Sequence, residues 1–215
     1  MGIAFFDMDK TLLRASSGLL YVRYLARRHK INTIEMVSVL LISAQYSLNF
    51  LNFPKTMARM SQHIKGGNAQ DTKTLCDLWF DECLVHYIAP LALERLHQHQ
   101  TRGDYVYMLS ASTQFAVEPL ARFLDVPYRC TQLEVIDNHF TGRIAGIHCY
   151  AEGKAYWGEQ VASQHNVSLN DCTFYTDSYS DRILLEKVGH PVAVNPDRKL
   201  AALARTNSWA IEHFY

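Results

Sequence analysis

The chain opens with a short apolar run over residues 2–6 that ends abruptly in the polar segment 7–11 (DMDKT). This change of character predicts a buried strand that leads into a polar loop. Two later strand-like runs, 105–109 and 172–176, are also followed at once by polar residues. Reactive groups in parallel sheets lie beyond the carboxyl ends of the strands, so the residues after these three runs are expected to meet at one edge of a sheet.

Helix and strand patterns divide the chain into two parts. From about residue 16 to 102 there is no strand pattern, and the expected helices cover 16–30, 37–51, 54–65, 69–86 and 91–102. After Gly103, helices are expected at 113–124, 153–165, 181–188 and 197–206, and they alternate with strands at 105–109, 172–176 and 191–194 and a β-hairpin at 131–150. This alternation predicts an α/β fold, a doubly wound, Rossmann-like parallel sheet with helices on both faces.

The all-helical part follows the first strand, so it is expected to be an inserted α-helical cap. We predict an α/β core of residues 1–13 and 91–215 and a cap of residues 14–90. Within the cap, the 18 residues 36–53 carry no charge, which is near the lower length limit for a membrane span. Six Ser, Asn or Gln residues in that stretch argue against a span and favour a cap helix, a dimer surface or a cleft for an apolar substrate.

Charge and cysteine usage exclude several classes of protein. Lys plus Arg and Asp plus Glu each number 21, so the net charge is zero, which argues against a nucleic-acid partner. Five scattered cysteines without a CxxC pair indicate neither a zinc site nor a disulfide framework. No basic and apolar leader precedes the first acidic residue, so we expect a cytoplasmic protein, either a monomer or a homodimer.

The polar residues at the strand ends suit phosphoryl chemistry. Asp7 and Asp177, brought together, would repel each other unless a cation neutralised them, and hard oxygen ligands favour Mg²⁺. A metal ion, Lys154 and hydroxyl donors that converge on one point suit a phosphoryl group, whose charge must be spread in the transition state. A carboxylate can also attack phosphorus to form an aspartyl-phosphate.

Four segments, in this order, resemble the four motifs of haloacid dehalogenase-like phosphatases. They are residues 7–13, Ser110, Lys154 and residues 177–181. The long helical segment after the first motif resembles the phosphoserine-phosphatase-like subgroup with a helical cap. One position departs from the family, which commonly has glycine where this chain has Thr176. The resemblance implies a Mg²⁺-dependent phosphatase that hydrolyses a small phosphomonoester through an aspartyl-phosphate.

The resemblance also implies the roles of four carboxylates. Asp7 would be the nucleophile and a metal ligand. Asp9 would protonate the leaving oxygen, then deprotonate the attacking water, and lend its backbone carbonyl to the metal. Asp177 would bind Mg²⁺ directly, while Asp181 would orient the water molecules of the metal.

The phosphate of the substrate would be bound by a second group of residues. The resemblance implies Thr11, Ser110, the backbone of Ala111, and Lys154 in this role. Ser112 could also donate to the phosphate, or it could instead cap the following helix. Lys154 would neutralise the charge of the phosphoryl oxygens.

The partner is expected to be a small phosphorylated metabolite, with an apolar part as one option. Phosphoserine phosphatases supply an acidic residue soon after the first motif to read the substrate amine, whereas this chain has no carboxylate between Asp9 and Glu35. That difference argues against phosphoserine itself. Two other readings of the same residues stay open: a phosphotransferase with the same intermediate, and a non-enzymatic phospho-acceptor module, which the large cap disfavours.

Overall fold

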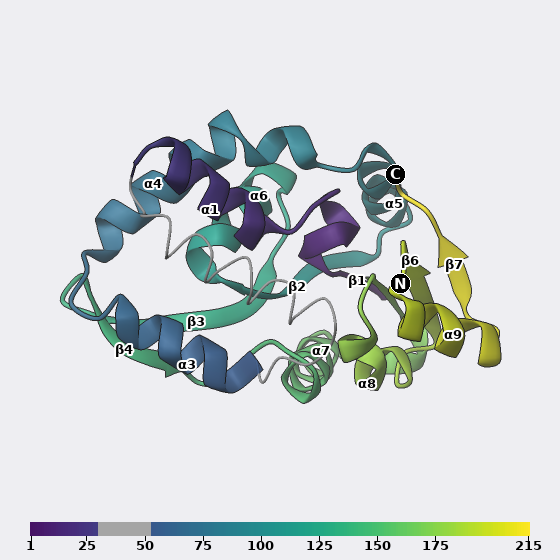
Figure 1. Cartoon of the computed structure of the whole chain (residues 1–215). Helices are drawn as coiled ribbons and strands as arrows, with labels where there is room; N and C mark the ends of the chain where they lie inside the picture. Colours follow the sequence, from purple (N-terminus) through teal and green to yellow (C-terminus); the bar gives the residue numbers. More distant parts are fainter. Residues whose placement is uncertain (30–52) are drawn as a thin grey trace.

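The computed structural model describes residues 1–29 and 53–215, and a seven-stranded sheet runs through its centre (Figure 1). The strand order is β4-β3-β2-β1-β5-β6-β7, and within the described residues only β4 runs antiparallel to its neighbour. The strands are β1 (Ile3–Phe6), β2 (Tyr105–Thr113), β3 (Tyr128–Ile136), β4 (His139–Ala145), β5 (Cys172–Thr176), β6 (His190–Val194) and β7 (Ala210–Glu212).

The central strand β1 is apolar along its whole length because both of its faces are covered. Ala4 and Phe6 point into one hydrophobic cluster, whereas Ile3 and Phe5 point into the cluster on the opposite face. All four side chains are buried. Successive side chains of β1 point to opposite faces of the sheet, so this one strand contributes to two hydrophobic cores. All four residues are therefore apolar.

Helices cover both faces of the sheet, as predicted. One face packs against α5 (Pro90–Thr101) and α6 (Gln114–Leu124). The other face packs against α7 (Glu152–Gln164), α8 (Arg182–Leu185) and α9 (Arg198–Thr206). Short helical turns occur at Met8–Leu12, Leu84–Tyr87, Leu169–Asp171 and Tyr179–Asp181. The fold is the doubly wound α/β architecture that the sequence predicts.

The described part of the predicted cap is helical and packs against the core. It contains α1 (Ser17–Arg27), α3 (Phe53–His63) and α4 (Ala69–Glu82). Leu20 of α1 and Trp79 of α4 belong to the same cluster as Met8 beneath them. Helix α3 lies along β4 instead, where the side chains of Ser61 and Gln62 both donate to the Gly142 carbonyl, at 2.9 and 2.8 Å. Helices α1 and α4 thus share the hydrophobic core of the sheet, whereas α3 is attached through β4.

Two expectations for the cap fall on residues that the structure does not describe. The predicted helix at 37–51 and, apart from Phe53, the uncharged stretch 36–53 lie outside the described residues. Within residues 1–29 and 53–215, no helix is long and apolar enough to cross a membrane.

Several predicted boundaries were wrong. Strand β2 continues to Thr113 instead of ending at 109, so the serines after it belong to the strand. The helix predicted at 181–188 is a single turn, α8, that follows the turn Tyr179–Asp181. The hairpin begins at Tyr128 instead of 131, because β3 already pairs with β2 there. The short edge strand β7 was not predicted.

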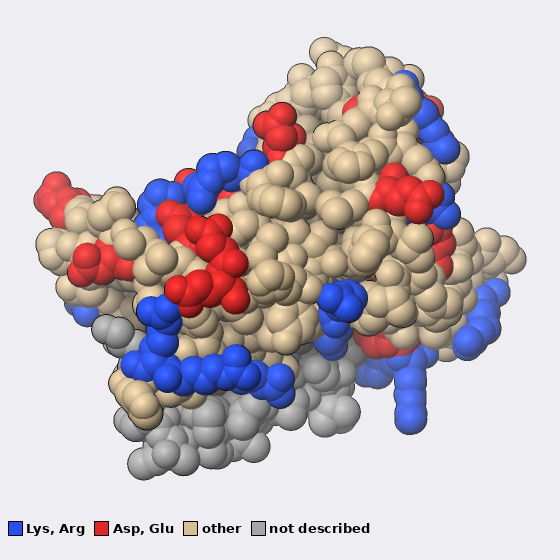
Figure 2. All heavy atoms as spheres, turned by 90° about the horizontal axis from the view of Figure 1, so that it is seen from above, with Lys and Arg blue, Asp and Glu red and all other residues tan. Residues whose placement is uncertain are grey.

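Ion pairs join α4, which lies in the segment predicted to be the cap, to α6. Lys73 Nζ lies 2.9 Å from Glu118 Oε1, and Arg122 Nη2 lies 2.8 Å from Asp77 Oδ1. Figure 2 shows the same mixture at larger scale, with acidic and basic side chains side by side on the face that is drawn. Pairs this exposed contribute little stability each, so the packing of α1 and α4 on the core dominates their attachment.

Candidate active site

Three strands place their carboxyl ends side by side at one edge of the sheet. β1 pairs in parallel with β2 on one side and with β5 on the other. Asp7 extends β1, since its N–H donates to the Tyr175 carbonyl at 2.9 Å. Asp7 therefore lies between Ser110 of β2 and Asp177, which follows β5. The parallel topology thus places these three residues at the same edge of the sheet, as the sequence predicts.

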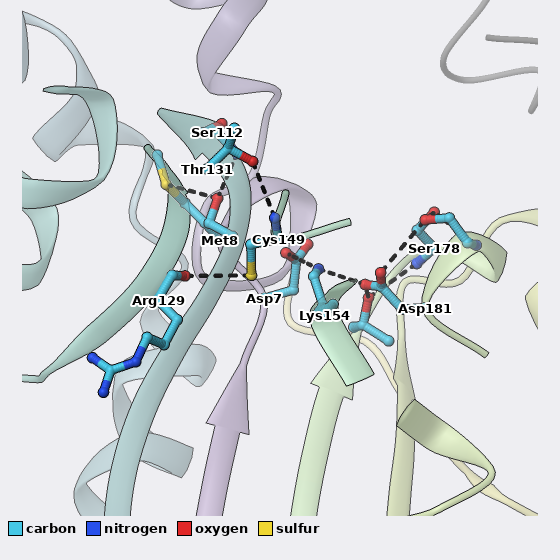
Figure 3. Close-up of polar contacts among 12 residues, drawn as sticks. Asp7, Met8, Ser112, Arg129, Thr131, Cys149, Lys154, Ser178 and Asp181 are labelled. Carbon is cyan, nitrogen blue, oxygen red and sulfur yellow. Dashed lines mark hydrogen bonds and ion pairs between the residues drawn. The ribbon is translucent and has the colours of Figure 1, made fainter. Parts of the chain in front are cut away.

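Lys154 reaches this edge from helix α7 and lies between two carboxylates (Figure 3). Its Nζ is 2.7 Å from Asp7 Oδ1 and 2.7 Å from Asp181 Oδ2. Lys154, Asp7 and Asp181 are only 2%, 6% and 1% exposed. Charge-assisted hydrogen bonds of this length, shielded from water, fix the ammonium group firmly opposite the predicted nucleophile.

The carboxylates of this site carry more negative charge than Lys154 neutralises. Burial, together with the negative charges of Asp181 and Asp9, raises the pKa of Asp7 to about 7, although the Lys154 ammonium opposes the shift. Burial, reinforced by the charge of Asp7, also raises the pKa of Asp177 well above its usual range. Two buried carboxylates whose pKa values are both raised form a site that a cation would stabilise.

The donor set fits Mg²⁺. Asp7 and Asp177 offer hard oxygen ligands, which Mg²⁺ prefers. In the described part of the chain, no three His, Cys, Asp or Glu side chains form a ready-made metal cage. Mg²⁺ does not need one, because it binds through one or two carboxylates and keeps water or phosphate oxygens in its remaining positions.

Asp9 is held by the start of the cap. The turn that contains it is irregular, since Asp9 has extended dihedral angles and Lys10 has a φ of 54°. Asp9 Oδ1 accepts a hydrogen bond of 2.8 Å from the N–H of Ser17, the first residue of α1. Burial nevertheless raises the pKa of Asp9. A carboxyl group that keeps its proton to higher pH is suited to give that proton to a leaving group.

The serines of β2 contact the first motif and helix α1. Ser110 Oγ accepts from the Ser112 N–H at 3.1 Å and donates to the Met8 sulfur at 3.8 Å. The hydroxyl of Ser112 lies 3.2 Å from that of Ser17. Ser112 is not a helix cap, because Thr113 holds the N-cap position of α6. Ala111 lies between the two serines in the strand.

The remaining predicted residues are buried near the same edge. Thr11 is fully buried, and its hydroxyl has no hydrogen-bond partner among the described residues. Asp181 holds the N-cap position of α8 without capping it. Its Oδ2 accepts instead from Lys154 and, at 2.6 Å, from the hydroxyl of Thr176. The sequence did not predict the contact of Thr176 with Asp181 or that of Ser17 with Asp9. The signal that could have indicated them is a hydroxyl residue close to the fourth and to the first motif.

The helix that carries Lys154 begins with a strained residue. Ala151, at the N-cap of α7, has φ 49° and ψ −116°, a region that glycine adopts far more readily than alanine. We expect Ala151→Gly to raise the free energy of unfolding by about 1 kcal/mol, because relief of strain outweighs the added freedom of the unfolded chain. Urea unfolding measures this, with Ala155→Gly in the same helix as a control that must destabilise. A lower free energy of unfolding in Ala151→Gly would contradict the inference that the backbone is strained at Ala151.

Known proteins are similar to this chain in sequence. The haloacid dehalogenase-like hydrolase family matches residues 4–186. A protein of Mycobacterium tuberculosis named a phosphoserine phosphatase is 31% identical over 216 residues, which cover 98% of this chain and 70% of that protein. A protein of Neisseria meningitidis named a histidinol-phosphatase is 27% identical over 99% of this chain and 98% of its own length.

Solved structures share the fold. A protein of unknown function from Bordetella pertussis superposes with a TM-score of 0.88 at 25% identity, over 99% of this chain and 98% of that one. A substrate-bound phosphoserine phosphatase superposes with a TM-score of 0.74 at 18% identity, over 100% of this chain and 93% of that one.

Proposed function

The chain belongs to the haloacid dehalogenase-like hydrolases, as a phosphatase of the phosphoserine-phosphatase-like group, and on that premise we propose that it hydrolyses a small phosphomonoester with Mg²⁺ through an aspartyl-phosphate on Asp7. The observation that carries this proposal is the position of Lys154, whose Nζ lies 2.7 Å from both Asp7 and Asp181 in a buried site. A buried cation beside a carboxylate at the end of a strand is the arrangement that phosphoryl transfer needs.

The nucleophile and the proton donor would be two carboxylates of the first motif. An Asp7 oxygen attacks phosphorus, a new P–O bond forms, and the bond to the substrate oxygen breaks. Asp9 gives its proton to that leaving oxygen. Asp9 then takes a proton from water, whose oxygen attacks the phosphorus and releases inorganic phosphate, which restores Asp7. The raised pKa of Asp9 supports this part.

A second group of residues would bind the phosphoryl group of the substrate. Lys154 neutralises the phosphoryl oxygens, and Ser110, Ser112 and the backbone of Ala111 donate hydrogen bonds to them. Thr11, whose buried hydroxyl has no partner among the described residues, is a further donor at this edge. These donors are fixed before substrate arrives, so little reorganisation is needed during the reaction.

The metal would be held by the carboxylates of Asp7 and Asp177 and by the backbone carbonyl of Asp9. When bound, Mg²⁺ supplies positive charge that stabilises the transferring phosphoryl group. Asp181 contributes through its position beside these ligands, where we propose that it orients water of the metal shell.

The substrate would be a small phosphorylated metabolite whose organic part faces the cap. The segment just after the first motif offers Arg14, Ser16 and Ser17 and no carboxylate, so a free substrate amine lacks an acidic partner there.

All five cysteines are free. Unpaired thiols suit the reducing cytoplasm, where we place this reaction.

Metal removal tests this function. We expect hydrolysis of p-nitrophenyl phosphate to stop in EDTA and to return with Mg²⁺ but only poorly with Ca²⁺, whose larger shell allows both Asp7 oxygens to bind and so blocks attack. Phosphate release is measured after each metal is added back, together with a panel of phosphorylated metabolites that ranks substrates. Full activity in EDTA, with metal removal confirmed by elemental analysis, would refute the proposal.

A further inference from the structure

Thr176 stands at the end of β5, directly before Asp177, with a completely buried side chain. Successive side chains of a strand point to opposite faces, so Thr176 shares the face of Phe174, which packs in the cluster of α7 and α8. Lys154 enters the site from that same face, since its Nζ lies 5.8 Å from the centre of the Phe174 ring. The Thr176 hydroxyl is therefore on the side of the sheet where the lysine arrives.

The direction of the Thr176 hydrogen bond is determined by its neighbours. The N–H of Ser178 can only donate, and it lies 3.3 Å from Thr176 Oγ1. A hydroxyl has a single hydrogen to give, and the carboxylate of Asp181 lies 2.6 Å away. Thr176 thus accepts from the backbone and donates to Asp181 Oδ2.

Asp181 Oδ2 is also the atom that binds Lys154. The oxygen receives Thr176 Oγ1 at 2.6 Å and Lys154 Nζ at 2.7 Å, and the same Nζ continues to Asp7 Oδ1 at 2.7 Å. The other Asp181 oxygen has a weaker contact, 3.5 Å from the Ser180 hydroxyl. Without the Thr176 hydroxyl, Asp181 would lose its shortest hydrogen bond, and its carboxylate would be oriented only by the Lys154 ammonium and the weaker Ser180 contact among the contacts of the described residues.

We propose that Thr176 is a positioning residue that holds the Asp181 carboxylate and, through it, places the Lys154 ammonium opposite Asp7. The inference rests on the proposed phosphatase function. A lysine displaced by even a fraction of an ångström would meet the phosphoryl group less well in the transition state.

The test compares Thr176→Val, which keeps the shape and removes the hydroxyl, with Thr176→Ser, which keeps the hydroxyl and removes a methyl group. For p-nitrophenyl phosphate, we expect the valine variant to lower kcat about 10- to 100-fold with KM changed less than about threefold. The serine variant should stay within about threefold of wild type. Melting temperatures of both variants identify any loss that comes from unfolding.

A purely structural role predicts a different pattern. In that case both variants would lose melting temperature, and the kcat of the folded fraction would not change, which would overturn the proposal. A serine variant as impaired as the valine variant would also overturn it. Crystal structures of wild type and Thr176→Val give a readout that does not depend on activity: we expect the Lys154 Nζ to move away from Asp7 Oδ1, and an unchanged contact would refute the proposal. Failure of wild type to hydrolyse any phosphomonoester would count against the proposed function alone.

Discussion

Asp7→Asn is expected to remove phosphatase turnover while the fold stays intact. The amide is nearly the same size as the carboxylate and its oxygen can still accept from Lys154, but it cannot attack phosphorus. Loss of covalent catalysis should raise the activation free energy by on the order of 4–8 kcal/mol, which is several powers of ten in kcat. Initial rates with p-nitrophenyl phosphate measure the loss. Mass spectrometry of acid-quenched protein should find the phosphoryl group on wild type and not on the variant.

Asp104→Asn provides a matched control for this substitution. Asp104 is also a partly buried, hydrogen-bonded carboxylate, which accepts from the Gly2 N–H at 2.7 Å and lies 2.9 Å from His99 Nδ1, but it stands at the start of β2, at the opposite edge of the sheet. Asp104→Asn should lower the free energy of unfolding and leave kcat close to that of wild type. If Asp7→Asn kept a tenth of wild-type kcat, the aspartyl-phosphate mechanism would be wrong.

The sheet could be predicted where burial imposes a clear pattern. β1 and β5 are central strands whose residues are all buried, and each strand is followed at once by an aspartate, Asp7 or Asp177. β7 is a three-residue edge strand that, among the described residues, pairs with β6 alone, and so short a segment has no periodicity to detect. The residues after Asp177 form a tight turn before α8, which a helical pattern does not distinguish from the helix itself.

The site could be predicted as a set of residues but not as a set of contacts. Topology alone brings Asp7, Ser110 and Asp177 to one edge, because parallel strands end together. The bridge from Lys154 to Asp181 depends on the direction in which α7 crosses the sheet, which spacing along the chain does not contain. The contact of Ser17 with Asp9 likewise depends on where α1 begins.

Lys154→Met should damage both activity and stability, because Lys154 is the cation that separates two buried carboxylates. Methionine fills a similar volume without charge, so Asp7 and Asp181 would face each other uncompensated. Breaking a buried ion pair by removing one partner lowers the free energy of unfolding by about 3–5 kcal/mol. Loss of the charge that we propose neutralises the phosphoryl oxygens should lower kcat/KM by about 10³-fold or more. Urea unfolding and initial rates measure the two effects separately.

The stability loss in Lys154→Met should depend on pH. The pKa of Asp7 is already raised from 3.8 to about 7 in the folded protein, and removal of the lysine, which opposes that shift, raises it further. A carboxyl group whose pKa is raised by folding binds more protons in the folded state, so it favours folding at low pH and loses that contribution as pH rises through the folded pKa. The difference between wild type and Lys154→Met should therefore be larger at pH 8 than at pH 5.

The same substitution at an exposed lysine is a control that shows whether the stability loss comes from the buried position of Lys154 or from the loss of any lysine. Lys187 pairs with Glu159 on the surface, where its side chain is 45% exposed. Water screens that pair, so Lys187→Met should leave stability at pH 8 unchanged within experimental error. If Lys154→Met were equally neutral at pH 8, the lysine could not be the buried counter-charge of Asp7 and Asp181. Lys154→Met should therefore lower the free energy of unfolding strongly at pH 8 and less at pH 5. This pattern follows only if protonation of Asp7 relieves the repulsion between the two carboxylates that the ammonium no longer compensates.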